Sequence, residues 1–227
     1  MNPDRRVFDI VMDRPYGTTY NSYLVRGQKI AIIEAVKTGF LEEFLSNIKS
    51  LADIKDIEYI ILNHSEPDHS GALKQFLEAA PHVKVVTSRA GHQYIKKIVN
   101  REFQYQVVND GDEIDLGGKK LKFIYAPFLH WPDTMFTYIE QDGVLFSCDA
   151  FGCHFCEADM VDSAVENRRG YWKAFRYYFD VIMSPFKENI VRAVEKIKDI
   201  KIDVVAPSHG PVLVENPYEQ MSLYREW

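Results

Sequence analysis

The chain has 227 residues, with 33 acidic against 27 basic side chains, and its formal net charge at pH 7 is −6. Because 46% of the residues are hydrophobic and 13% are aromatic, the chain can bury a full core, which excludes disorder as its main state, and no apolar run reaches the roughly 20 residues that cross a bilayer. The acidic balance disfavours nucleic acid as a partner, the polar start Met1–Arg6 lacks the apolar stretch of a signal peptide, and three cysteines cannot form a disulfide framework, so we expect a cytoplasmic protein.

The first half of the chain predicts strands, then alternating helices and strands. Turn residues Gly17 and Gly27 separate stretches rich in β-branched and aromatic residues that predict strands over Val7–Met12, Thr18–Val25 and Lys29–Glu34. A helical pattern over Phe40–Leu51 precedes a buried strand at Tyr59–Leu62. Helices and strands then alternate, over Ala72–Ala80, Val83–Thr87, Gly91–Val99 and Phe103–Val108. This alternation indicates an α/β fold in which helices pack on a sheet.

The second half repeats this order of strands, helix and strand. The expected strands are Lys120–Tyr125, Met135–Glu140 and Val144–Ser147. A helical region follows over Tyr171–Lys198, broken at Pro185, and a short strand lies at Asp203–Ala206. Because no linker or low-complexity segment interrupts the chain, we expect residues 1–227 to form one domain.

Histidines and carboxylates follow four of the predicted buried strands. An isolated polar residue in a loop is usually only solvated. Here, however, seven such residues follow successive strands, and side chains at strand ends of a layered α/β fold converge on one point. The seven residues are His64, Glu66, Asp68, His69, His130, Asp149 and His209. The sequence therefore predicts a metal site.

The segment from Asn63 to Gly71 carries the pattern His-x-Glu-x-Asp-His. It resembles the His-x-His-x-Asp-His signature of the metallo-β-lactamase superfamily, with Glu66 in place of the second His. That replacement resembles the flavodiiron proteins, the O2- and NO-reducing A-type flavoproteins. Further stretches are similar to the same family: Gly17–Tyr23, His130–Asp133, Phe146–Gly152 and Pro207–Gly210. The resemblance covers nearly the whole chain and implies a metallo-β-lactamase-like αββα sandwich.

The same resemblance implies ligands for two iron ions, a non-haem di-iron centre. The ligands it implies for one ion are His64, Glu66 and His130, and for the other Asp68, His69 and His209, with Asp149 bridging the two. The donor types support this reading, because hard carboxylate oxygens favour Fe(III), whereas hydrolytic members bind zinc largely through imidazoles. Glu66 thus argues against a hydrolase, although manganese or zinc could also occupy the site.

Flavodiiron proteins carry a flavodoxin-like FMN domain after this one. The sequence ends at Trp227, and it contains no Gly-rich phosphate loop, so we expect no flavodoxin domain and no FMN in this chain. Two ferrous ions supply two electrons, which take O2 only to the peroxide level. We therefore expect an oxygen sensor, oxidised by O2 to a peroxo or diferric state and read by a partner protein in bacterial signalling such as chemotaxis.

The alternative is an enzyme, an O2 or NO reductase that takes electrons from a separate flavoprotein or rubredoxin. The sequence does not decide between sensor and reductase, or between monomer and homodimer. It predicts no membrane insertion, and no catalytic residue beyond the metal ligands.

Three residues are candidates for contacts around the ligands. Tyr16 stands where many flavodiiron proteins have a His, so its phenol either bonds a bound ligand or is simply buried. Tyr178 resembles the family's tyrosine near the di-iron pocket, with Tyr177 as the alternative. His154 lies near Asp149 in sequence and could donate a hydrogen bond toward it.

Other cysteines and histidines are expected outside the metal site. Cys148 and Cys153 stand where the family often has Asn and Gln, which alters the lining of the pocket. Cys153 and Cys156 form a Cys-x-x-Cys motif without a second pair, which favours buried or partly exposed thiols over a structural metal. The remaining histidines, His82 and His92, are expected at the surface.

Overall fold

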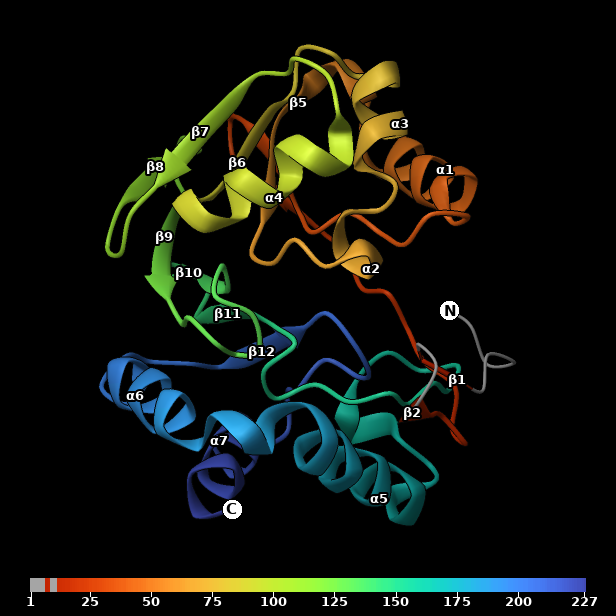
Figure 1. The fold of residues 1–227 in the computed structure, drawn as a ribbon, viewed down its shortest axis with the longest axis vertical. Coiled ribbons are helices and arrows are strands. Elements are labelled where there is room, and N and C mark those ends of the chain that lie inside the picture. Colours follow the sequence, from red (N-terminus) through yellow and green to blue (C-terminus); the bar gives the residue numbers. More distant parts are fainter. Residues whose placement is uncertain (1–6, 9–11) are drawn as a thin grey trace.

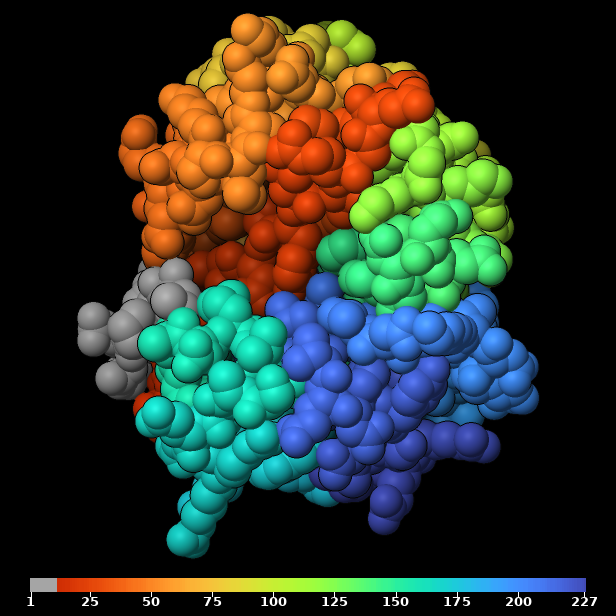
Figure 2. Space-filling view, turned by 180° about the vertical axis from the view of Figure 1, so that it is seen from behind, coloured from red at the N-terminus to blue at the C-terminus, as the bar shows by residue number. Residues whose placement is uncertain are grey.

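Two five-stranded sheets packed face to face, with helices on both outer faces, form the fold (Figure 1). The computed structural model describes residues 7–8 and 12–227. Seen from behind, α1 and β3 lie in the upper half and α5 and α7 in the lower half (Figure 2). No helix in the described ranges is both long and apolar enough to cross a membrane.

The first sheet has the order β3-β4-β5-β6-β7. Its strands are β3 (Tyr23–Arg26), β4 (Ile30–Ile33), β5 (Ile57–Leu62), β6 (Lys84–Ser88) and β7 (Tyr105–Val108). Only β3 is antiparallel to its neighbour; the other pairs are parallel, as the alternation of helices and strands predicted. The helices on its outer face are α1 (Leu41–Leu51), α3 (Leu73–Ala79) and α4 (Arg89–Val99).

The second sheet has the order β12-β11-β10-β9-β8. Its strands are β8 (Glu113–Asp115), β9 (Lys120–Tyr125), β10 (Met135–Ile139), β11 (Val144–Cys148) and β12 (Val204–Pro207). Because β10 is antiparallel to both β9 and β11, and β12 is parallel to β11, the strands β9, β11 and β12 all end at the same edge. Outside this sheet lie α5 (Arg168–Tyr178), α6 (Lys187–Ile197) and α7 (Pro217–Glu226).

Alternating side chains explain why both faces of each sheet are buried. Ile32 packs toward the outer helices, whereas its neighbours Ala31 and Ile33 pack between the sheets. A strand turns successive side chains to opposite faces, so a strand covered on both sides reads as a continuous apolar run. The inner layer contains Phe123 and Met135 from the second sheet, both fully buried.

Several predicted boundaries were wrong. The strand expected over Thr18–Val25 begins only at Tyr23, and the residues before it form a loop. The helix expected over Tyr171–Lys198 is α5 and α6, separated by a π-helical turn (Phe179–Met183) and a 3-10 turn (Ser184–Phe186), which places the break at Pro185 as predicted.

Four further elements complete the comparison. Both β8 and α7 were missed; α7 opens with Pro217 in its first turn, a signal that the sequence did offer. The expected strand Val7–Met12 corresponds to β1 (Val7–Phe8) and the start of β2 (Met12–Asp13), and its residues 9–11 lie outside the described residues.

Candidate metal centre

All seven predicted ligands come together at one edge of the sandwich. His64 and Glu66 follow β5, and Asp68 and His69 lie on the one-turn helix α2 (Pro67–Ser70). The other three follow the strands of the second sheet that end at the same edge, β9, β11 and β12: they are His130, Asp149 and His209. The side chains converge as the sequence predicted, because strand ends meet at one edge in a layered fold, and their role as metal ligands stays a prediction.

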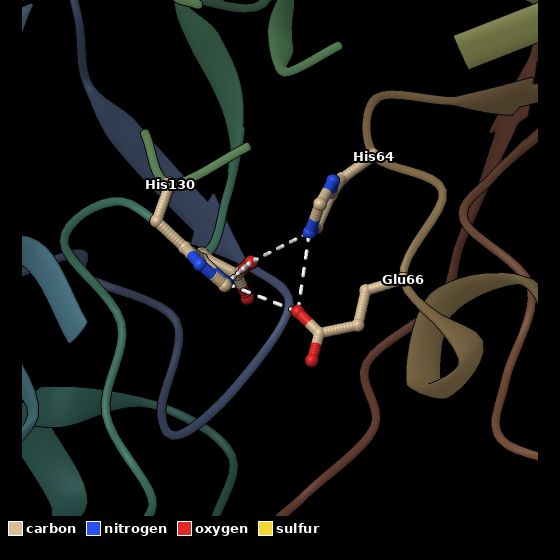
Figure 3. Close-up of side chains that lie close together, drawn as sticks. His64, Glu66 and His130 are labelled. Carbon is tan, nitrogen blue, oxygen red and sulfur yellow. Dashed lines mark hydrogen bonds and ion pairs between the residues drawn. The ribbon is translucent and has the colours of Figure 1, made fainter. Parts of the chain in front are cut away.

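The first group consists of His64, Glu66, His130 and Asp149. His64, Glu66 and His130 point toward one another (Figure 3). Glu66 Oε2 lies 3.2 Å from His64 Nε2 and 3.0 Å from His130 Nε2. Asp149 Oδ2 lies 3.7 and 3.5 Å from the same two nitrogens. These separations are those of neighbouring ligands around one ion, since metal bonds of about 2.1 Å place adjacent donors roughly 3.0–3.5 Å apart.

The second group consists of Asp68, His69 and His209, joined by the other oxygen of Asp149. Asp68 lies 3.4 Å from His69 Nε2 through Oδ1 and 3.1 Å from His209 Nε2 through Oδ2. Asp149 Oδ1 lies 3.2 Å from His69 Nε2 and 3.4 Å from His209 Nε2. The two oxygens of Asp149 thus face different groups, the arrangement expected of a bridging carboxylate.

The local backbone explains how six adjacent residues serve two groups. An extended stretch turns alternate side chains the same way, which holds for His64 and Glu66. At Pro67 the chain enters α2 instead, and this turn carries Asp68 and His69 to the second group. Ser70 closes the turn by donating its hydroxyl hydrogen to the carbonyl oxygens of Ser65 and Glu66, at 2.8 and 3.0 Å.

Buried donor atoms without hydrogen bonds test whether the site fits metal ions. Both carboxylate oxygens of Asp68 and of Asp149, and Nε2 of His69, are buried and have no hydrogen bond among the described residues. Such atoms are costly unless something else satisfies them. Because they converge with the other donors on two points, metal cations fit this arrangement.

Two supporting contacts were missed by sequence reasoning. Asp133 Oδ1 lies 3.2 Å from His64 Nδ1, and its Oδ2 accepts a hydrogen bond of 2.8 Å from the Ser65 backbone N–H. The carbonyl oxygen of Thr19 lies 2.6 Å from His209 Nδ1. A partner on the far nitrogen fixes the orientation of a ligating imidazole. The motif His130–Asp133 contained the signal, but nothing in it showed that Asp133 reaches His64.

Glu34 and Cys148 lie close to His69. Their potential ligand atoms and those of His69 lie within 4.8 Å of one another, and all three residues are buried. Glu34 Oε1 accepts a hydrogen bond of 3.0 Å from the Asn63 backbone N–H, which ties β4 to the loop after β5. Burial raises the pKa of the Glu34 carboxyl to about 7. Sequence reasoning did not single out Glu34.

Opposite charges keep the ligands ionised in the absence of metal. Burial alone would lower the pKa of His64, but the carboxylates of Asp133 and Glu66 raise it to about 10. Asp149 and Glu66 likewise raise the pKa of His130 to about 9 against the effect of burial. For Asp149, burial acts to raise the pKa, but the neighbouring His69 and His130 hold it well below its ordinary value. A metal ion that binds here must therefore displace protons from imidazoles.

Comparison with known proteins places the chain in a family. Residues 18–210 match the family described as "ODP family beta lactamase". The chain belongs to this family. It is 47% identical to the flavo-diiron protein FprA2 of Clostridium acetobutylicum, over 94% of this chain and 54% of that protein. It is 36% identical to the type A flavoprotein fprA of Rhodobacter capsulatus, over 98% of this chain and 51% of that protein.

Solved structures agree with this assignment. The rubredoxin oxygen:oxidoreductase of Desulfovibrio gigas matches with a TM-score of 0.95 and 29% identity, over 99% of this chain and 57% of that one. The flavodiiron protein of Giardia intestinalis matches with a TM-score of 0.95 and 27% identity, over 100% of this chain and 55% of that one. These matches confirm the predicted αββα fold and the resemblance to flavodiiron proteins. The chain spans about half the length of the curated relatives named here.

The two candidate tyrosines, Tyr178 and Tyr177, differ in burial and in their contacts with histidine rings. Tyr178 is buried, and its ring centroid lies 5.1 Å from that of His154 and 6.3 Å from that of His209. Tyr177 is 38% exposed and faces away. His154 Nδ1 lies 2.7 Å from the Thr18 hydroxyl oxygen, and its ring lies 4.7 Å from that of His209. The expected hydrogen bond from His154 to Asp149 stays a prediction.

The remaining tyrosine, cysteine and histidine candidates lie in different environments. The Tyr16 ring lies 5.9 Å from that of Phe155, and its contact with a bound ligand stays a prediction. Burial raises the pKa of the Cys148 and Cys153 thiols, and both are buried, as expected. His82 is exposed as predicted, but His92 is not: it is buried, because its ring stacks on Tyr105 at 3.9 Å.

We expect the substitution Asp133→Asn to weaken metal binding in the first group by about 10- to 100-fold, because His64 loses the carboxylate that orients it. The measurement is a titration of metal-free protein with Fe(II) under anaerobic conditions against a competing chelator. The control is Asp199→Asn, an exposed carboxylate distant from the site, which should leave affinity unchanged. Equal affinities for the two variants would contradict the role given to Asp133.

We also expect metal affinity to rise with pH between about pH 6 and 8, by about tenfold per pH unit for each proton displaced. The reason is that the pKa values of His64 and His130, about 10 and about 9, leave both rings protonated in the metal-free protein over this range. The same chelator titration at three pH values measures the slope. An affinity independent of pH would show that the rings are already neutral.

Proposed function

We propose that the two groups hold two iron ions and that the domain reduces O2 or NO with electrons from a separate flavin- or rubredoxin-type donor. The observation that carries the proposal is the bridging position of Asp149 between two groups, each with two imidazoles and a carboxylate of its own. Iron bound there would supply reversible binding of a small oxidant and one-electron changes of charge, which zinc does not. The printed names of the relatives, flavo-diiron protein and rubredoxin oxygen:oxidoreductase, support this choice.

The carboxylates suit a centre that changes charge. Glu66, Asp68 and Asp149 place three anionic groups around the site, two of them almost fully buried. In a low-dielectric interior these charges favour the more positive, oxidised state of a metal pair. A hydrolase would instead use a metal-bound hydroxide and gains nothing from a site that stabilises oxidation.

The exposure of the ligands supports one entry route for a small molecule. The side chains of Glu66 and His130 are 18% and 15% exposed, whereas those of the other five ligands are 0–2% exposed. O2 or NO therefore reaches the centre from the side of Glu66 and His130.

Tyr178 is the proton-bearing group that we place beside the bound molecule. Burial, reinforced by the charge of Asp149, raises the pKa of its phenol well above the ordinary value, so the hydroxyl keeps its proton. A neutral phenol can donate a hydrogen bond to an anionic oxygen that forms in the site. His154 packs against both Tyr178 and His209, and this contact fixes the orientation of the Tyr178 ring.

The decisive experiment is anaerobic loading with Fe(II) followed by exposure to limiting O2 or NO. We expect two irons per chain and, with a reduced flavodoxin-type donor in excess, continuous loss of O2 or NO. Zinc-loaded protein and the variant Asp149→Asn are the controls, and both should consume none. Stoichiometric uptake of O2 that stops after one oxidation would instead favour the oxygen-sensing function expected from the sequence. Failure to bind two irons would contradict both.

A second prediction concerns Tyr178 and uses its neighbour as a matched control. We expect Tyr178→Phe to lower the rate of O2 or NO consumption by about 10- to 100-fold, the range for loss of a proton donor, with iron content unchanged. Tyr177→Phe removes the same hydroxyl from the exposed side of α5 and should have no effect. Initial rates at saturating donor measure both. Equal rates in the two variants would remove Tyr178 from the mechanism.

A further inference from the structure

The outer face of α5 is strongly basic in an acidic chain. This 11-residue helix carries Arg168, Arg169, Lys173 and Arg176 and has no acidic residue, although the net charge of the whole chain is −6. Arg168 pairs with Glu215, and Arg176 with Asp180, each at 2.9 Å. Arg169 and Lys173 are exposed, and neither has an ion-pair or hydrogen-bond partner within the described part of the chain.

Two aromatic side chains lie among these cations. The half-buried Trp172 and the exposed Tyr177 line a shallow hollow together with Arg169, Lys173, Arg176 and Asp180. The Trp172 ring is held from below by Tyr171 and Phe175, with centroids 5.2 and 5.7 Å away. Tryptophan, tyrosine and arginine are the residues that dominate binding energy at protein interfaces, especially where the aromatic ring is already fixed. This composition is unlike a merely solvated helix face, which would expose lysines and glutamates.

The inner face of the same helix reaches the candidate metal centre. Tyr178 packs on His154, whose ring lies 4.7 Å from the ligand side chain His209. Tyr171 packs on Phe155 at 5.7 Å, next to His154 in the chain. One layer of helix therefore separates the basic face from a metal ligand, with aromatic rings in contact between them.

We propose that the outer face of α5 is the docking surface for an acidic, flavodoxin-type electron donor that carries a reduced flavin. The proposal rests on the proposed function and names the surface where its donor binds. Unpaired cations attract a partner of opposite charge and speed its association, while Trp172 supplies an apolar anchor. The donor is oxidised, its electrons pass to the metal centre, and they end on O2 or NO with an equal number of protons taken from water.

The test uses the iron-loaded protein and a reduced acidic flavodoxin as the donor. The double variant Arg169→Glu/Lys173→Glu reverses the two unpaired charges without touching the site. The matched control, Lys96→Glu/Lys97→Glu, makes the same change of charge on the exposed side of α4. We expect the first variant to raise KM for the donor at least tenfold with little change in kcat, and the control to stay within twofold. Added salt should raise KM of the unchanged protein toward that of the first variant.

A small-molecule reductant separates this proposal from the proposed function. With ascorbate in place of the flavodoxin, all three proteins should consume O2 at the same rate, because no docking is needed. If ascorbate supports consumption but the two double variants have the same KM for flavodoxin, the docking surface is overturned and the function stands. If the unchanged protein consumes neither O2 nor NO with either reductant, the proposed function fails. Far-UV circular dichroism and thermal unfolding check that the variants fold.

Discussion

The carboxylate of Asp149 lies within 3.7 Å of the Nε2 atoms of all four histidines, and this contact joins the two halves of the site. Charges buried between sheets are costly unless they face opposite charges. Here His64 and His130 face carboxylates that raise their pKa values, and imidazoles in turn lower the pKa of Asp149, so the arrangement is organised for cations. Replacing the protons by metal ions keeps the same attraction and removes the unsatisfied oxygens of Asp68 and Asp149.

The sandwich supports this cluster by joining distant segments behind each ligand. Asp133 ties the loop after β9 to His64 and Ser65 from the other sheet. Thr19, in the loop before β3, bonds His209 through its carbonyl and the backbone N–H of Gly210 through its hydroxyl. Ligands fixed in this way cannot rearrange much when the charge of the centre changes, which suits repeated oxidation and reduction.

Two exposed features of the molecule bear on the proposed function. On the side of Glu66 and His130 the ligands are partly exposed, which leaves room for a diatomic molecule. The helix α5 carries Tyr178 on its buried face and a basic, aromatic outer surface. In the proposed function the small molecule reaches the ligands at Glu66 and His130, and the donor protein binds the outer face of α5.

The sequence by itself indicated the main strands and the seven residues that meet at the candidate metal centre, because residue type and spacing after apolar β-branched runs are local properties. It also carried the family resemblance, since those motifs are short and continuous. Only the tertiary structure decided that Thr18–Ser22 forms a loop bonded to His154 and His209, and that His92 is buried against Tyr105. It alone assigned Asp133 to His64 and Tyr178, rather than Tyr177, to the site. The physical reason is the same in each case: the partner lies on a segment far away in the chain, and a local pattern contains no information about which segments meet.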